Sequence, residues 1–486
     1  MHLRLIAQVL ALISAFVGLG MAAAAFVGLL SGEVAARALG AGAMVAFLVG
    51  AALTAAGGLR RRNENLLHRE AFLVVALAWV LAGILGGLPL WFSGHFGGFT
   101  WSMFEAFSGF TTTGATILAD IGAVPASLLL WRSTMQWLGG GGIVLLGVAI
   151  LPLLGVGGME LYRAEVPGPT TTKLQPRIRE TARLLWRAYL LLTGTQVLLL
   201  VIAGVGLFDA VNHAFTTIST GGFSTKNASI AAFDDPIIEG IFIFFMLLAG
   251  TSFSLHFAAA SRGPKVYARD AEFRIYLAFI VGALILIASA LWINAMYGAA
   301  DSVRYGLFQV VSIITSTGFA NADFEAWRAV HALPAFTIFA LMLSGGCAGS
   351  TAGGIKVVRV WMVFKQSAHE LFHQVHPRAV TRLKLGGRVV PTQAQRSLTG
   401  FILLYVLLFV LGSLSLSILG MDFVSATSSS VSALSNIGPA LGTLGPFDNY
   451  AHVPDAGKWI LVVMMLVGRL EIFTILVLLL PEYWRR

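Results

Sequence analysis

The fold is decided by the stretch VSIITSTGF at residues 311–319, an apolar run that ends in hydroxyl side chains and a glycine. Three other segments align with it by eye: FSGFTTTG at 107–114, FTTISTGG at 215–222 and VSALSNIG at 431–438. Each of the four lies between two long apolar segments, so the repeating unit is predicted to be helix, short helix, loop, helix. Four such units in one chain can surround a common axis with pseudo-fourfold symmetry.

The composition places these repeats in a membrane. The chain has 486 residues, of which 57% are hydrophobic and 11% charged, and its mean hydropathy is +0.82. This excludes an ordinary soluble globule. The single cysteine, Cys347, excludes a disulfide framework and a thiolate metal cluster. A net charge of +9 could indicate nucleic-acid binding in a soluble protein, but in a membrane protein it is typical of basic cytoplasmic loops.

Apolar segments long enough to cross the hydrocarbon core, about 20 residues, recur along the whole chain. They run near residues 4–30, 37–59, 70–95, 125–155, 183–207, 236–260, 273–297, 333–364, 397–419 and 457–480. The first is too long for the core of a signal peptide, and we expect it to be a retained helix. The sequence therefore predicts an all-α polytopic membrane protein with about ten spans.

Basic residues indicate the orientation of these spans, because cytoplasmic loops carry an excess of Lys and Arg. They cluster at Arg60, Arg61 and Arg62; at Arg163, Lys173, Arg177, Arg179, Arg183 and Arg187; at Arg262, Lys265, Arg269 and Arg274; from Lys356 to Arg396; and at Arg485 and Arg486. We expect these ends and both termini to be cytoplasmic. The opposite face then carries residues 96–124, 208–235, 298–332 and 420–456, each expected to be a short helix followed by a re-entrant loop.

The four loops have the chemistry that a dehydrated potassium ion needs. Backbone carbonyl and hydroxyl oxygens can replace its water shell, and four extended loops can supply a ring of them. Glycine permits the backbone angles that aim successive carbonyls inward, and the C-terminal end of each short helix favours a cation. The alternative is that the Ser/Thr/Gly clusters are turns outside the membrane. Four clusters in register between spans favour the ion pore.

The same motifs resemble the Trk/Ktr/HKT superfamily of K⁺ transporters, over nearly the whole chain. The matching pieces are TTTGAT at 111–116, STGGFST at 219–225, TSTGF at 315–319 and SNIGP at 435–439. The resemblance implies one filter glycine per repeat, at Gly114, Gly222, Gly318 and Gly438, with Gly221 as the alternative in the second loop. It also implies K⁺ coordination by the preceding residues: Thr112, Thr113, Thr220, Gly221, Ser316, Thr317, Asn436 and Ile437.

The resemblance further implies the organisation of the chain. Two additional N-terminal spans and the overall length are similar to the TrkH branch rather than the KtrB branch. The implied division is an N-terminal two-helix extension at 1–65 and pore repeats at 66–160, 161–265, 266–370 and 371–486, with a gating loop at 344–354. A glycine in all four filter positions resembles a K⁺-selecting member, with some Na⁺ leakage.

Partners and location are also implied by the resemblance. They are a homodimer in the bacterial inner membrane and a cytoplasmic TrkA-like ring with nucleotide-binding domains, which would dock on the basic surface from Lys356 to Arg396. The chain is expected to need no cofactor besides the transported K⁺.

A glycine-rich run, SGGCAGSTAGG at residues 344–354, interrupts the eighth apolar segment. Each glycine weakens a helix by up to about 1 kcal/mol. In the superfamily that it resembles, this segment is an intramembrane loop that obstructs the closed pore. The alternative is close helix packing through small residues. The gate residues implied by the resemblance are Gly345, Gly346, Gly349, Ser350, Thr351, Gly353, Gly354, Lys356 and Arg469.

Two charged residues, Arg469 and Glu471, lie within the last apolar segment, where each costs about 3 kcal/mol to insert. The resemblance implies that Arg469 faces the cavity under the filter and forms an electrostatic barrier. The alternative is a structural ion pair with Glu471 or with another helix, and for Glu471 a structural role is favoured. Four other carboxylates near the starts of the short helices are expected to cap them: Glu105, Asp209, Asp301 and Asp422.

The main alternative function is an ion-coupled secondary transporter, a K⁺ symporter driven by H⁺ or Na⁺, because interrupted helices and repeats also occur there. Such proteins usually carry acidic coupling residues at midspan, and apart from Glu471 this chain has few. An enzyme is not expected, since no His-Glu-x-x-His or Gly-x-Ser-x-Gly motif occurs. The histidines His369, His373 and His376 lack Cys or carboxylate partners at ligand spacing, which argues against a metal site.

Overall fold

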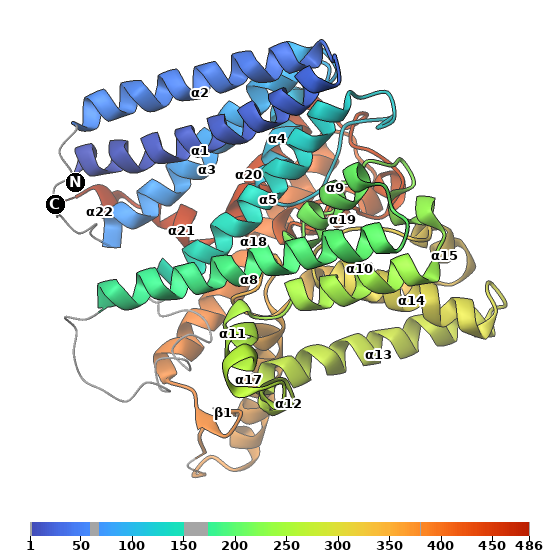
Figure 1. Ribbon diagram of the computed structural model, residues 1–486. Coiled ribbons are helices and arrows are strands. Elements are labelled where there is room, and N and C mark those ends of the chain that lie inside the picture. The colour runs from blue at the N-terminus through green and yellow to red at the C-terminus, as the bar shows by residue number, and fades with distance from the viewer. Residues whose placement is uncertain (1, 59–67, 150–173, 380, 486) are drawn as a thin grey trace.

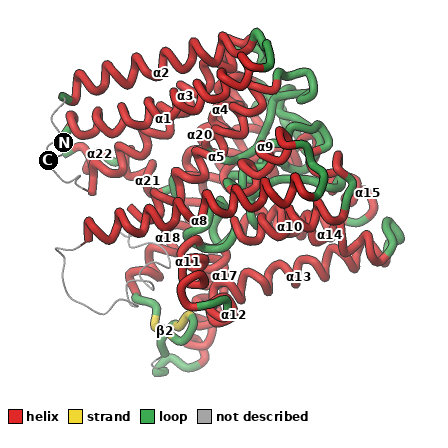
Figure 2. The backbone as a smooth tube through the Cα atoms, viewed as in Figure 1, coloured by secondary structure: helices red, strands yellow, loops and turns green. Residues whose placement is uncertain are grey.

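The computed structural model describes residues 2–58, 68–149, 174–379 and 381–485. Within these ranges the chain is mainly helical (Figure 2), with one short antiparallel hairpin of β1 (Lys384–Leu385) and β2 (Arg388–Val389). The predicted all-α fold is therefore confirmed. Many of the loop segments gather at the end of the molecule where α9 and α15 lie (Figure 2).

Six of the described helices are long and apolar enough to cross a membrane, or eight if each of two bent pairs is one span. The six lie in α1 (Leu3–Leu30), α2 (Ala35–Gly57), α3 (His68–Ser93), α8 (Leu174–Ile202), α13 (Ala271–Ile293) and α18 (Thr392–Ile418). Two further predicted spans correspond to α5 (Ala126–Ala149) and α16 (Ala332–Ser344). These elements agree with a polytopic membrane protein.

The two spans predicted at 236–260 and 457–480 are each bent, and neither is one straight helix. α10 (Pro236–Ala249) and α11 (Phe253–Arg262) meet at 96°, and α20 (Asp455–Arg469) meets the segment that contains α21 (Phe473–Leu476) at 106°. At the first bend the Gly250 carbonyl accepts from the Cys347 N–H at 2.9 Å, and the Phe253 N–H donates to Gly349 at 3.1 Å. These backbone groups thus bond to another segment instead of continuing one helix.

Four short helices lie between the long ones, one in each repeat. They are α4 (Phe99–Phe110), α9 (Leu207–Ile218), α14 (Ala299–Ile314) and α19 (Phe423–Ser435). Each packs between the two helices of its own repeat and also against a helix of a neighbouring repeat: α9 against α5, α14 against α10, α19 against α16, and α4 against α20. These contacts join each repeat to the next and the fourth repeat back to the first, so the four repeats surround a common centre.

Glycines of α3 allow the first short helix to approach closely. A Cβ on Gly83 would overlap the Phe107 ring, and one on Gly86 would overlap the Phe110 ring. The Trp131 indole N–H of α5 donates to the Gly86 carbonyl at 3.0 Å, beside the same ring. The small residues in α3 therefore make room for the aromatic side chains that hold α4 in the core.

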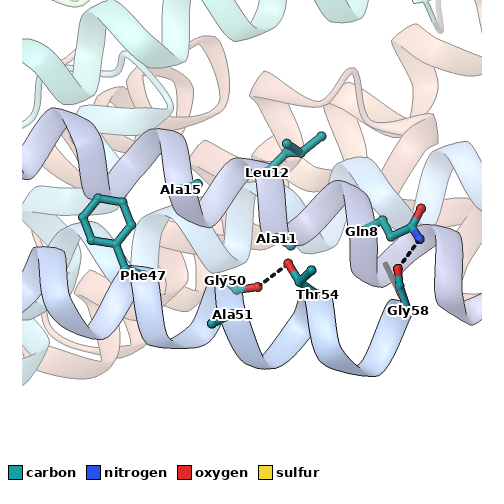
Figure 3. A pocket seen from close by; sticks show the side chains of 9 residues that line it. All are labelled: Gln8, Ala11, Leu12, Ala15, Phe47, Gly50, Ala51, Thr54 and Gly58. Carbon is teal, nitrogen blue, oxygen red and sulfur yellow. Dashed lines mark hydrogen bonds between the residues drawn. The ribbon is translucent and has the colours of Figure 1, made fainter. Parts of the chain in front are cut away.

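The two N-terminal helices form a hairpin at one edge of the molecule, opposite α13 (Figure 1). A groove between them is lined mainly by small and apolar residues (Figure 3). Its polar side chains bond to backbone: Gln8 Nε2 donates to the Gly58 carbonyl and Thr54 Oγ1 to the Gly50 carbonyl, each at 2.8 Å. This hairpin is the additional pair of helices predicted before the first repeat.

The two ends of the chain lie side by side (Figure 1). Arg69 Nη1, at the start of α3, donates to the Arg485 carbonyl at 3.0 Å, and the Tyr483 hydroxyl donates to the Arg69 carbonyl at 2.5 Å. Tyr483 belongs to the short C-terminal helix α22 (Pro481–Trp484). Both termini are thus at the same end of the helices.

The division into an extension and four repeats stays a prediction at its boundaries. The boundaries at residues 65 and 160, the clusters at 60–62, 163 and 173, and residue 486 lie outside the described residues. Residue 265 begins α12 (Lys265–Arg269), and residue 370 lies within α17 (Val357–Val375).

Candidate ion pore

The four loops that follow the short helices share one backbone conformation. Two positions in each loop have positive φ: the glycine predicted to belong to the filter, which we call the filter glycine, and the residue two before it. The values are 53° and 83° for Thr112 and Gly114, 54° and 77° for Thr220 and Gly222, 53° and 78° for Ser316 and Gly318, and 54° and 99° for Asn436 and Gly438. Side chains rarely adopt this region, so its repetition shows that the loops are equivalent. Gly222, rather than Gly221, is the counterpart of the other three glycines.

A hydrogen bond folds each loop back onto its short helix in the same way. The N–H of the residue before the filter glycine donates to the carbonyl five residues earlier. The four bonds are Thr113 to Ser108 at 2.8 Å, Gly221 to Thr216 at 2.8 Å, Thr317 to Ser312 at 2.9 Å and Ile437 to Ser432 at 3.0 Å. The loops therefore descend from the ends of the short helices with one common geometry.

The filter glycines also show that the four loops meet. A Cβ on each glycine would lie against the carbonyl oxygen of the residue before the next loop's glycine. The pairs are Gly114 with Gly221, Gly222 with Thr317, Gly318 with Ile437, and Gly438 with Thr113. The fourth pair returns to the first loop, so the glycines and these carbonyls form a closed ring. No side chain could be added on a filter glycine without pushing a neighbouring carbonyl away.

The side-chain oxygens of the loops are mostly bonded within the protein. Thr317 Oγ1 pairs with Thr315 Oγ1 at 2.8 Å, and Thr113 Oγ1 accepts from Asn436 Nδ2 at 3.0 Å. Thr220 Oγ1 donates to the Ser219 carbonyl at 2.7 Å. Thr112 Oγ1 and Asn436 Oδ1 are buried with no partner among the described residues, so these two oxygens and the backbone carbonyls are the oxygen ligands available to an ion at the ring.

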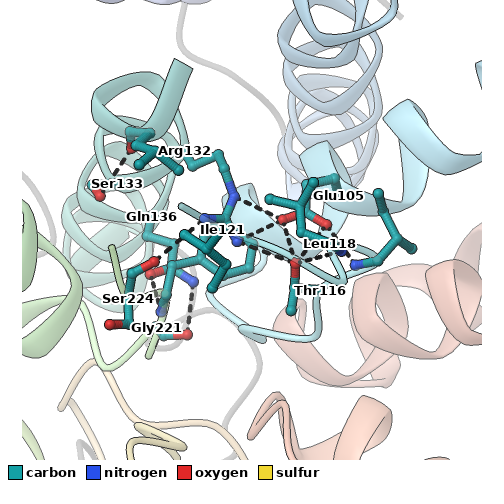
Figure 4. A network of polar contacts seen from close by, with 12 residues as sticks. Glu105, Thr116, Leu118, Ile121, Arg132, Ser133, Gln136, Gly221 and Ser224 are labelled. Carbon is teal, nitrogen blue, oxygen red and sulfur yellow. Dashed lines mark hydrogen bonds and ion pairs between the residues drawn. The ribbon is translucent and has the colours of Figure 1, made fainter. Parts of the chain in front are cut away.

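In the first two repeats a polar side chain nine residues before the filter glycine holds the loop from behind. In the first repeat this residue is Glu105, which accepts from Thr116 Oγ1 at 3.0 Å and from the Ile117 N–H at 2.9 Å (Figure 4). In the second it is His213, whose Nε2 lies 3.0 Å from Ser224 Oγ. Glu105 is buried within α4, so the prediction that it caps the helix is wrong.

Arg132 of α5 links the first two loops and was not foreseen from the sequence. Its guanidinium lies 2.7 Å from the Glu105 carboxylate, with the Arg132 and Glu105 side chains only 1% and 0% exposed, and it stacks over the Phe223 ring at 4.1 Å. A lone arginine in an apolar span is the sequence signal that could have identified it, because such a charge requires a partner.

The other three predicted caps have different outcomes. Asp422 does cap α19, since its carboxylate accepts from the Ser425 N–H at 3.0 Å. The Ser425 hydroxyl and N–H lower the pKa of Asp422 below its ordinary value. Asp209 lies in the first turn of α9, where it pairs with Lys226 at 2.9 Å instead of capping by its side chain. Asp301 lies in the first turn of α14, and Gly298 occupies its N-cap position.

The glycine-rich run forms a non-helical segment between α16 and α17, residues 345–356, which we call the intramembrane loop. It lies against the second and fourth short helices at their C-terminal ends and against the third filter loop. Thr351 Oγ1 donates to the Ile218 carbonyl at 3.0 Å, and the Gly353 N–H donates to Ser316 Oγ at 2.6 Å. A Cβ on Gly353 would overlap the Ser435 carbonyl oxygen. The loop therefore lies directly beside the ring at the ends of the short helices.

Backbone conformation explains why glycine is frequent in this loop. Gly345, Gly349 and Gly354 have φ values of 70°, 75° and 74°, which glycine adopts at little cost. Gly346 is tight for another reason, since a Cβ there would lie 2.8 Å from the Gly250 carbonyl oxygen. Ser350 Oγ closes the turn by donating to the Cys347 carbonyl at 2.6 Å.

Charged side chains lie within the loop and beside it. Arg469 Nη1 donates to the Thr351 carbonyl at 2.7 Å, while its Nε and Nη2 have no partner among the described residues. The Lys356 ammonium donates to the Ala352 carbonyl. Glu471 pairs with Arg359 of α17 at 2.6 Å, so its ion pair joins α17 to the bend between α20 and α21 and does not involve Arg469.

Two histidines of α17 lie at the same threonine hydroxyl. His373 Nε2 lies 2.8 Å from Thr381 Oγ1, and His369 Nε2 lies 3.0 Å from the same hydroxyl. Within the described ranges no group of three or more His, Cys, Asp or Glu side chains could hold a metal ion.

A polytopic helical protein with four equivalent re-entrant loops around one axis belongs to the class of membrane transport proteins built as a four-repeat pore. The chain matches the family model TrkH, described as a cation transport protein, over residues 39–485. It therefore belongs to the TrkH family, as the motif resemblance predicts.

Relatives and a solved structure agree with this assignment. The chain is 43% identical to the Trk system potassium uptake protein TrkH of Halomonas elongata and 42% identical to that of Escherichia coli K12, each over 100% of both chains. The crystal structure of the potassium transporter TrkH from Vibrio parahaemolyticus matches with a TM-score of 0.91 and 39% identity, covering 100% of both chains. The relatives carry the names of transporters, in agreement with the prediction that the chain is not an enzyme.

Proposed function

We propose that this chain takes up K⁺ across the bacterial inner membrane by passive, gated conduction through the ring of four filter loops. The observation that carries the proposal is the closed series of glycine-to-carbonyl contacts from Gly114 through Gly222 and Gly318 to Gly438 and back. A ring of carbonyl oxygens can replace the hydration shell of the ion. The substrate follows from the relatives, which are named potassium uptake proteins.

The ion would be held by the loop residues that precede each glycine. The eight positions are Thr112, Thr113, Thr220, Gly221, Ser316, Thr317, Asn436 and Ile437. The backbone has the same conformation at the corresponding positions of the four loops, and most of the side-chain hydroxyls at these positions form hydrogen bonds within the protein. Selectivity would therefore depend on how rigidly the backbone holds its carbonyls at the size of K⁺.

The intramembrane loop would be the gate. It contacts the ends of α9 and α19 and the third filter loop, and Arg469 holds it by the Thr351 carbonyl. A guanidinium beside the ring repels a cation strongly because little water is present to screen it. Conduction would require Gly345, Gly353 and neighbouring residues to move, together with Lys356 and Arg469.

Regulation and energy would come from outside this chain. The words "Trk system" in the relatives' names favour further components, and we propose a homodimer with a TrkA-like nucleotide-binding ring on the cytoplasmic side. The adjacent termini and the basic segment from Lys356 to Arg396 would then be cytoplasmic. A membrane potential of 100 mV contributes about 2.3 kcal/mol per inward charge, sufficient to concentrate K⁺ without a coupled ion.

Reversal potentials of the purified protein in planar bilayers test this function and separate it from symport. Passive conduction predicts a shift of about 59 mV for each tenfold K⁺ gradient and no shift when a pH gradient is added. A reversal potential that moves with the pH gradient, or K⁺ movement against its own electrochemical gradient when a Na⁺ gradient is added, would establish coupling and reject the channel mechanism.

The filter assignment is tested by Gly318→Ser in the same bilayers. The new side chain would push the Ile437 carbonyl out of the ring, so we expect K⁺ over Na⁺ selectivity to fall while total conductance persists. The matched control is Gly282→Ser on α13, where a Cβ meets nothing within 4 Å. Unchanged selectivity in Gly318→Ser would reject the ring as the filter.

A further inference from the structure

The second filter loop differs from the other three at one position. The residue before the filter glycine is Thr113, Thr317 or Ile437 in the first, third and fourth loops, but Gly221 in the second. Gly221 is not among the residues with positive φ, so the backbone does not require glycine there. Another reason must exclude a side chain.

That reason is the side chain of Gln136, which reaches from α5 of the first repeat into the second loop (Figure 4). A Cβ on Gly221 would overlap the amide carbon of Gln136. The Gln136 amide donates from Nε2 to the Gly221 carbonyl at 2.6 Å, and its Oε1 accepts from the Phe223 N–H at 3.1 Å. One buried amide thus fills the missing side-chain volume and binds the loop on both sides of Gly222.

Corresponding helices offer no such amide in two of the other repeats. Gly139 of α5 lies against the Phe110 carbonyl, and Gly468 of α20 lies against the Leu434 carbonyl in the same way. Phe110 and Leu434 each stand four residues before the filter glycine of their own loop. This equivalence places Met465 at the position of Gln136. Gly140 of α5 faces Ser219 of the second loop, and Gly250 faces Thr315 of the third loop in the same way. Because Gln136 stands four residues before Gly140, its counterpart in α10 is Met246, four residues before Gly250.

We propose that Gln136 is a positioning residue for ion selectivity, which acts as a substitute side chain for Gly221. The proposal rests on the pore function proposed above. In it, the side chain of Gln136 keeps one of the four filter loops rigid. Two adjacent glycines have more backbone freedom than any other pair of residues. The Gly221–Gly222 peptide would therefore move unless its neighbouring groups were held, and its carbonyl is the one that touches Gly114.

A substitution cycle tests the pairing of Gln136 with Gly221. The variants are Gln136→Met, which introduces the residue found in α10 and α20, Gly221→Thr, which introduces the residue found in the first and third loops, and the two together. Uptake of ⁸⁶Rb⁺ into K⁺-loaded liposomes is measured against competing external K⁺ or Na⁺. The readout is the ratio of the Na⁺ and K⁺ concentrations that halve uptake.

Each single change is expected to lower this ratio about tenfold, because Gln136→Met removes two buried hydrogen bonds and Gly221→Thr displaces the amide. The double variant should recover most of the wild-type ratio, since it rebuilds the arrangement of the other loops, with Ser219 close to the new threonine. A merely structural role would make the two losses add.

The matched control is Gln196→Met on α8. Gln196 is also a buried glutamine, but it bonds to Thr217 of the short helix at 3.0 Å and not to the filter strand. Its ratio should stay at the wild-type value. If Gln136→Met fails to assemble, Gly221→Ala reaches the same contact, and its loss should be relieved by Gln136→Ala.

The outcomes separate this proposal from the one on which it rests. Rb⁺ uptake by the wild type that K⁺ blocks more strongly than Na⁺ supports the pore itself. With that established, an unchanged ratio in Gln136→Met, an equal loss in Gln196→Met, or additive losses in the double variant would each overturn the role of Gln136. Equal blocking by K⁺ and Na⁺ in the wild type would instead overturn the selective pore.

Discussion

The buried ion pair behind the first filter loop allows a quantitative test. Glu105→Ala removes the carboxylate that lies 2.8 Å from Arg132 Nε and 2.7 Å from its Nη2. Arg132 would keep the Thr116 hydroxyl at 3.2 Å and the face of Phe223, but no negative charge. Removing one partner of a buried pair costs about 3–5 kcal/mol. We expect a loss of stability near the upper end, because the Arg132 side chain is only 1% exposed.

Thermal midpoints of the detergent-purified protein, read by size-exclusion chromatography after heating, measure this loss. Glu239→Ala is the matched control, since Arg304 is 23% exposed and keeps Asp234 at 3.3 Å. Its midpoint should fall less than that of Glu105→Ala. The apolar double variant of Glu105→Leu with Arg132→Met should be more stable than Glu105→Ala, because it leaves no unpaired charge. Equal midpoints for Glu105→Ala and the wild type would refute the reasoning.

Two further predictions concern the gate and a helix cap. Gly353→Ala adds a methyl group against the Ser435 carbonyl, so it should displace the intramembrane loop and raise the basal Rb⁺ flux several-fold. The control variant Gly282→Ala should leave the flux unchanged. Unchanged flux in Gly353→Ala would count against the assignment of this loop as the gate. Asp422→Ala should cost about 1 kcal/mol as a lost cap. Because the pKa of Asp422 is lowered by Ser425, the stabilisation is present at neutral pH and is lost as the pH falls through that lowered pKa. A difference between Asp422→Ala and wild-type thermal midpoints that did not shrink in acid would contradict this.

The repeated parts of the fold were predictable because they are local and occur four times. The apolar runs and the motifs ending at Gly114, Gly222, Gly318 and Gly438 can be aligned without any structure, and so the short helices and loops were placed correctly along the chain. The repeat also indicates which residues must be equivalent. Local patterns of this kind survive in sequence because each repeat has to form its own short helix between two spans.

The unpredicted features depend on contacts between distant residues. α10 and α11 bend because the intramembrane loop bonds to Gly250 and Phe253, about 100 positions earlier in the chain. Hydropathy cannot reveal that exchange of hydrogen-bond partners. Glu105 was mistaken for a cap because its true partner, Arg132, follows 27 residues later on another helix. The role of Gln136 could not be predicted from the sequence, because it depends on the absence of a side chain at Gly221.

The ring of four loops is made by a single polypeptide, and this has a consequence for how it can change over generations. In an assembly of identical subunits, one altered codon modifies every quadrant at once, and a complementary pair must work in four copies. Here each quadrant has its own stretch of coding sequence. The Gln136–Gly221 pair could therefore arise in one quadrant while Thr113, Thr317 and Ile437 remained in the others. Because the four quadrants belong to one chain, single substitutions can make one quadrant different from the others.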